Sequence, residues 1–189
     1  MDNIITDAQK ALARLMAGNE KYLFAKEGSG NISEEIRITT SEKGQHPYAT
    51  IITCSDSRVI PEKIFMTGIG EIFTIRVAGN VIGPFELGSV EYGAAHLHTP
   101  LIMVLGHSQC GAVNAAIHNA GHDNIKGITD EIKKAIGNEK NSTLCEKQNV
   151  LHSISKIKES TVIRKMIREQ NLVIAGAYYH IRSGKVELL

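Results

Sequence analysis

The sequence predicts an α/β domain in which a mostly parallel central sheet of four to five strands is flanked by helices. β-Branched and aliphatic runs that suit buried strands alternate with longer stretches of helical periodicity, which is typical of strand–helix–strand units. One run, residues 101–106, is aliphatic up to its closing glycine, as expected of a parallel strand covered on both faces. The 189 residues can bury a substantial core, so we expect a single domain over residues 1–189.

Residues 1–43 are expected to form an N-terminal helical arm. Apolar residues recur at helical spacing over 7–26, with Thr6 or Asp7 as the cap, and a second, short helix is expected over 33–43 after a break at 28–31. An amphipathic helix has no obvious place in a compact single-sheet domain, so we expect the first helix to protrude and to pack on a neighbouring subunit.

The remaining elements follow in order along the chain. Strands are expected at 48–53, 71–77, 101–106, 172–178 and 185–189, and helices at 86–97, 111–120 and over most of 127–170. Within the last of these, residues 126–142 are rich in Lys, Glu, Asn and Gly, which favours a mobile surface excursion.

Composition and charge exclude several classes of protein. The formal net charge is +1 and the basic residues are scattered, which argues against nucleic acid as a partner. The N-terminus lacks the pattern of a secretory signal, and the longest apolar run is too short to span a membrane, so we expect a cytoplasmic protein. Three cysteines in such a chain favour metal binding or catalysis over a disulfide framework.

Two segments carry chemistry: Cys54-Ser55-Asp56-Ser57-Arg58 and Gly106-His107-Ser108-Gln109-Cys110-Gly111. Each begins where an expected strand ends, and sites in open α/β sheets form at the carboxyl ends of strands. If the two strands are neighbours, Cys54, His107 and Cys110 converge. Two thiolates and an imidazole suit zinc, and three protein ligands leave the open position of a catalytic site. Two alternatives stay open at this point: buried apolar cysteines, or a structural metal with Asp56 as fourth ligand.

Asp56 and Arg58 favour the catalytic reading. An arginine two residues after the carboxylate can hold it with a bidentate fork and leave an oxygen free to accept a proton from metal-bound water. The alternative is that the two side chains form only a structural salt bridge in a loop, which would contribute little to stability.

Taken together, these motifs resemble the β-class carbonic anhydrases. The resemblance extends over most of the chain and is weakest over residues 121–147. Besides the two motifs above, it rests on segments that follow in family order: 15–22, 44–47, 70–73, 76–80, 89–92, 149–150 and 176–178.

The resemblance implies a function and a site. The function is the zinc-dependent, reversible hydration of carbon dioxide to bicarbonate and a proton, by attack of zinc-bound hydroxide, with one Zn²⁺ per subunit. Cys54, His107 and Cys110 would bind the metal, and Asp56 and Arg58 would form the catalytic dyad. The substrate would be bound by Gln45, as a hydrogen-bond donor, and by Phe73, Ala78, Tyr92 and Gly111. Ala78 is smaller than the valine of some relatives, which would widen the pocket.

The resemblance also bears on assembly and on an inactive state. The family forms dimers or dimers of dimers. In some relatives the aspartate that corresponds to Asp56 closes the site by binding zinc as the fourth ligand. This closure is coupled to bicarbonate in a second pocket that contains a tryptophan. Ile51 stands at that position here, although Arg76 matches the pocket's arginine, so we expect an open site near neutral pH.

Three other functions compete with this one. The same scaffold could hydrolyse carbon disulfide or carbonyl sulfide, and access to the pocket would decide. A non-catalytic zinc protein that senses bicarbonate would be favoured by loss of Asp56, Arg58 or Gln45, and all three are present. A nucleotide-binding α/β protein would need a phosphate loop, and the pair Gly68 and Gly70 is not one.

Overall fold

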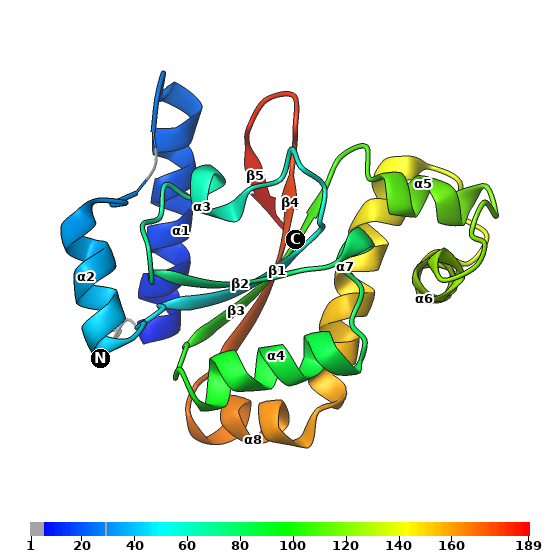
Figure 1. Ribbon diagram of the computed structural model, residues 1–189. Coiled ribbons are helices and arrows are strands. Elements are labelled where there is room, and N and C mark those ends of the chain that lie inside the picture. Colours follow the sequence, from blue (N-terminus) through cyan, green and yellow to red (C-terminus); the bar gives the residue numbers. More distant parts are fainter. Residues whose placement is uncertain (1–5, 29) are drawn as a thin grey trace, which may run out of the picture.

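A computed structural model describes the fold over residues 6–28 and 30–189. Five strands form one sheet in the order β2-β1-β3-β4-β5 (Figure 1). The first four are parallel and β5 runs antiparallel to β4. The strands are β1 Ala49–Thr53, β2 Ile72–Arg76, β3 Leu101–His107, β4 Val173–Tyr179 and β5 Val186–Leu188. The predicted mostly parallel α/β fold is therefore confirmed.

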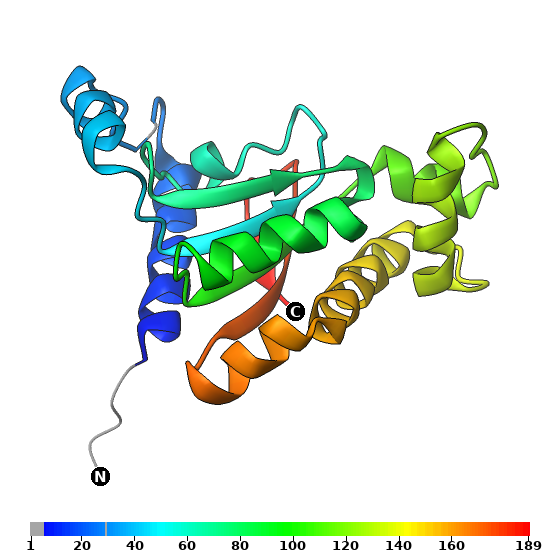
Figure 2. The same cartoon turned by 60° about the horizontal axis from the view of Figure 1, so that its bottom comes forward.

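Helices cover both faces of this sheet (Figure 2). They are α1 Asp7–Phe24, α2 Glu34–Lys43, α3 Pro61–Ile64, α4 Pro84–Ala95, α5 Gly111–Ile117, α6 Ile125–Ile136, α7 Ser142–Glu159 and α8 Thr161–Glu169, with a 3-10 turn, η1, at Ala78–Asn80. Alternation along the strands divides the core. Ile51 and Met103 pack with α1 and α3, whereas Ile52 and Val104 pack with α4, α7 and α8. The short elements α3 and η1 were not predicted.

The N-terminal helix is present, but its partner differs from the expected one. Thr6 caps α1 through a capping box with Gln9, and Leu15 is completely buried in this chain's own core. Gly18 permits this close packing, since a Cβ there would lie 2.0 Å from the Phe65 carbonyl oxygen. The expectation that α1 packs on a neighbouring subunit is therefore wrong for its buried face. The element that stands away from the sheet is α2, whose side chains are all exposed or half-buried (Figures 1 and 2). In the expected break at 28–31, residue 29 lies outside the described residues.

The region expected to be a mobile excursion is mostly ordered secondary structure. Helix α6 begins at Ile125 and buries Ile132 and Ile136 in a small cluster that also contains Cys54, Cys110 and residues of α5. The polar composition of 126–142 reflects the exposed face of an amphipathic helix. This small cluster adjoins the carboxyl ends of β1 and β3 and encloses that side of the sheet edge.

Among the described residues, no helix is both long and apolar enough to cross a membrane.

Candidate metal centre

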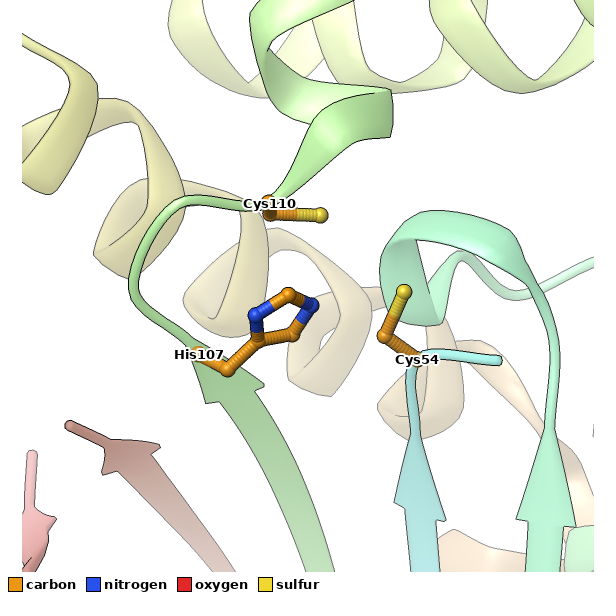
Figure 3. A group of neighbouring side chains, drawn as sticks. All are labelled: Cys54, His107 and Cys110. Atoms are coloured by element: carbon orange, nitrogen blue, oxygen red, sulfur yellow. The ribbon is translucent and has the colours of Figure 1, made fainter. Parts of the chain in front are cut away.

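Cys54, His107 and Cys110 converge at the carboxyl edge of the sheet. Cys54 follows β1 directly, His107 is the last residue of β3, and Cys110 is the N-cap of α5. Thr53 pairs with Leu105, so the two strands end side by side. The three side chains point toward one another (Figure 3), and their candidate ligand atoms lie within 4.8 Å of one another.

The imidazole of His107 is oriented to bind a metal. Its Nδ1 lies 2.9 Å from the Ser108 carbonyl oxygen, which can only accept, so Nδ1 carries the proton. Nε2 then presents a lone pair. This atom is buried, and no atom of residues 6–28 or 30–189 hydrogen-bonds to it. A buried nitrogen with a free lone pair, facing two thiols, is what a metal-binding histidine requires.

The two cysteines lie close enough to shift each other's pKa in opposite directions. The Cys110 thiol, together with the Gly79 backbone amide, outweighs burial and lowers the pKa of Cys54. The same contact with Cys54, together with burial, raises the pKa of Cys110. The Gly79 amide nitrogen lies 3.2 Å from Cys54 Sγ. Of the two cysteines, Cys54 is therefore the one whose surroundings favour the thiolate.

This donor set fits zinc. Soft thiolates and a neutral imidazole are good ligands for Zn²⁺, and a site of three protein ligands keeps a position for water or substrate. The orphaned His107 Nε2 is the observation of this structure that a bound metal would explain.

The expected contact between Asp56 and Arg58 is present. Arg58 Nε and Nη2 donate to the two carboxylate oxygens at 2.9 and 2.7 Å, and the Arg58 amide donates to Asp56 Oδ1 at 2.9 Å. The hydrogen bonds from Arg58, above all those of its side chain, hold the pKa of Asp56 well below its usual range. Arg58 also donates to the Gln109 carbonyl at 3.2 Å, so it ties the two motif loops together.

Arg76, which matches the arginine of the relatives' second pocket, lies against the backbone of the first motif. Its Nη2 donates to the Asp56 carbonyl oxygen at 2.9 Å, and its Nε donates to the Cys54 carbonyl oxygen at 3.4 Å. In this structure Arg76 anchors the backbone of the first motif. The motif pattern alone did not predict that anchor.

The predicted substrate residues fall into two groups. Ala78 and Gly111 adjoin the cluster: Ala78 precedes the amide that donates to Cys54, and Gly111 follows Cys110 with open space beside its Cα. Phe73 and Tyr92 form a tilted aromatic pair, with centroids 5.9 Å apart, on the α4 side of the sheet. Phe73 pairs with Thr50, three positions before the metal end of β1, which is about 10 Å along the strand.

Gln45 is the most distant of these residues. It is exposed, precedes β1, and lies against Gly70 at the amino edge of the sheet. Tyr48 lies three residues closer to Cys54 in the sequence than Gln45 does. Even Tyr48 is six strand positions, or roughly 20 Å, from Cys54. Gln45 therefore does not reach the metal centre of its own chain.

Comparison with known proteins agrees with this geometry. The profile of the carbonic anhydrase family matches residues 49–186. The β-carbonic anhydrase CcaA has the same fold, with a TM-score of 0.72, 27% identity, and 94% of each chain covered. The chain belongs to the β-class carbonic anhydrase family.

Two further members of this family match over most of the chain. Carbonic anhydrase 2 of Mycobacterium tuberculosis is 32% identical over 198 aligned residues, which cover 97% of this chain and 93% of the relative. A β-carbonic anhydrase of Sordaria macrospora, described as tetrameric, shares the fold with a TM-score of 0.71 and 23% identity, covering 82% and 87% of the two chains. The expected enzyme class, a carbonic anhydrase and hence a lyase, is confirmed.

Proposed function

We propose that this β-class chain hydrates carbon dioxide reversibly at a zinc ion held by Cys54, His107 and Cys110. The convergence of these three side chains around the orphaned His107 Nε2 carries the proposal. Zinc, when bound, acts as a Lewis acid and lowers the pKa of a coordinated water. Two thiolates cancel the charge of the metal, so it acidifies water less than a site of three histidines would.

Asp56 is proposed to orient the attacking water. Its strong contact with Arg58 keeps it ionised, so it is suited to accept a hydrogen bond throughout the catalytic cycle and poorly suited to store a proton. A carboxylate has about four lone-pair directions, and the three hydrogen bonds from Arg58 leave one for water. Because Arg58 also engages Asp56 through both oxygens, we propose that the site is open near neutral pH, with Asp56 off the metal.

The substrate pocket is proposed to form between subunits. Ala78 and Gly111 lie at the metal centre, whereas Gln45, Phe73 and Tyr92 lie too far along the sheet to reach it in the same chain. Exposure supports this division: Gln45 is exposed, and Tyr92 is 48% exposed although it is aromatic. We propose a homodimer, or a dimer of dimers, in which these three residues complete the metal centre of a neighbouring subunit with a donor and an apolar wall.

Stopped-flow measurement of carbon dioxide hydration, with metal analysis of the same samples, tests the proposal. The zinc-loaded protein should be active and a strong chelator should abolish the activity. Asp56→Asn should retain zinc and lose roughly 10²–10³-fold in kcat, as expected when a positioned hydrogen-bond partner of the attacking water is lost. Zinc-loaded wild-type protein that is inactive at pH 8.5 would instead favour a bicarbonate sensor. Carbon disulfide and carbonyl sulfide, assayed in parallel, would show whether the pocket prefers another substrate.

A further inference from the structure

Helix α7 presents three buried polar side chains to the metal centre. Glu146, Asn149 and Ser153 are 4%, 1% and 1% exposed. Their spacing of three and then four residues places them on one face of the helix. Each of them hydrogen-bonds to backbone outside its own helix: Glu146 to Cys110 itself, and Asn149 and Ser153 to the turn whose Gly79 amide contacts Cys54.

Glu146 holds the backbone of Cys110. Its Oε1 accepts from the Cys110 amide at 3.0 Å, and its Oε2 accepts from the Tyr178 hydroxyl at 2.5 Å. A buried carboxylate is costly unless its oxygens find donors, and both oxygens do so here. Tyr178 lies on β4, so it fixes the carboxyl group and through it the start of α5.

Asn149 and Ser153 hold the turn that contacts Cys54. Asn149 Nδ2 donates to the Gly79 carbonyl at 2.7 Å, and Ser153 Oγ donates to the Asn80 carbonyl at 2.8 Å. Gly79 and Asn80 both have positive φ, of 71° and 44°, and an asparagine in that region needs support from its surroundings. The amide of the same Gly79 is the donor to Cys54 Sγ.

The same helix also packs on the strand that ends at His107. Gly106 lies directly before this histidine, and a Cβ on it would lie only 2.4 Å from Val150 Cγ2. Glycine at this position thus lets α7 approach the backbone of β3. One helix therefore touches the backbone next to all three candidate ligands.

We infer that α7 is the positioning element of the metal centre, with Glu146 setting the geometry of Cys110 and Asn149 that of Cys54. The inference rests on the proposed zinc site and adds residues outside it. Outer hydrogen bonds of this kind restrict ligands to the geometry that the metal prefers. The Gly79 amide also draws electron density from the Cys54 sulfur, which partly offsets the charge that two thiolates donate to zinc.

Competition with a chromogenic chelator, using the purified full-length protein and Zn²⁺, tests the inference without an activity assay. Glu146→Ala and Asn149→Ala should each raise the zinc dissociation constant by roughly 10–100-fold. Glu146→Gln should regain most of the affinity, because its carbonyl oxygen can accept from Cys110 while its amide group donates to Tyr178. In cobalt-substituted protein, Asn149→Ala should also shift the thiolate-to-cobalt absorption band, which a loss of stability alone would not do.

Ile157→Val is the matched control, a buried change on the same helix outside the metal cluster. It should lower stability and leave the affinity for zinc unchanged. Should Glu146→Ala not fold, Asn149→Ala alone decides. Wild-type affinity and an unshifted cobalt band in folded Asn149→Ala would overturn the inference while leaving the zinc site intact. Failure of the wild-type protein itself to bind zinc would overturn the proposed function.

Discussion

The two edges of the sheet differ in how complete they are. At the carboxyl edge, Cys54, His107 and Cys110 are buried, mutually oriented and supported by hydrogen bonds within one chain. Toward the amino edge, Gln45 is exposed and Tyr92 is half exposed. Under the proposed function, a single chain thus contains all three metal ligands and only part of the substrate pocket. Metal binding should therefore depend on the chain alone, and turnover on the assembly.

The largest expected effect on activity comes from two variants that separate metal binding from turnover. Cys54→Ser should lose zinc and lower carbon dioxide hydration by roughly 10³-fold or more, because the metal supplies several kcal/mol of transition-state stabilisation. Gln45→Ala should retain one zinc per subunit and lose roughly 10–100-fold in activity, as expected when a substrate-positioning contact is removed. Metal analysis and stopped-flow assays of both variants check this. Zinc loss in Gln45→Ala would contradict the division between the two edges.

Mixing subunits probes the division directly. Cys54→Ser subunits keep Gln45, and Gln45→Ala subunits keep the metal centre, so a mixed dimer contains one complete site if the two edges meet across the interface. An equimolar mixture that exchanges subunits freely should recover about a quarter of wild-type activity, because half of the dimers are mixed and each has one of two sites. Size-exclusion chromatography with light scattering would establish that the variants assemble. Activity of the exchanged mixture equal to the mean of the two separate variants would show that each site is built from one chain.

The metal centre could be predicted from the sequence for a physical reason. Parallel strands end at one edge, so residues that directly follow two aliphatic runs were expected to meet, and Cys54 and His107 do. The contact of Asp56 with Arg58 was predictable because it spans only two residues. The separation of Gln45 from Cys54 followed in the same way, because the two residues flank one expected strand. A motif that gives only order along the chain did not show, however, that Phe73 would lie with Tyr92 away from the metal centre.

Two other features depend on long-range packing. The periodicity of α1 indicated a buried face but not the surface that buries it, which proved to be the chain's own sheet. The contacts of Glu146 and Asn149 pair side chains with backbone 36 and 70 residues away. Such pairs leave no periodic pattern, and Asn149 stood out only as part of a family segment.

The smallest expected effect is on stability, and it concerns Tyr48, which holds the amino edge of the sheet near Gln45. Tyr48 lies three residues after Gln45, and its amide donates to the Glu71 carbonyl oxygen at 2.9 Å. The Arg14 guanidinium carbon lies 4.1 Å from the centre of its ring. Burial raises the pKa of Tyr48 to about 12, although the nearby Arg14 lowers it in part.

Because the folded state keeps this proton longer than the unfolded state does, its stabilisation is fully present below about pH 10 and is lost as pH rises toward about 12. The free energy of unfolding of the wild-type protein should therefore fall more steeply with pH in this window than that of Tyr48→Phe. The difference in slope is at most about 1.4 kcal/mol per pH unit, the limit for one proton. Urea denaturation of both proteins between pH 8 and pH 11.5 measures it, with pH 8 as the reference where the two slopes should agree. If the free energy of unfolding depended on pH in the same way for both proteins, Tyr48 would be as accessible in the folded protein as in the unfolded chain. The segment that carries Gln45 would then not be held in place by burial of Tyr48.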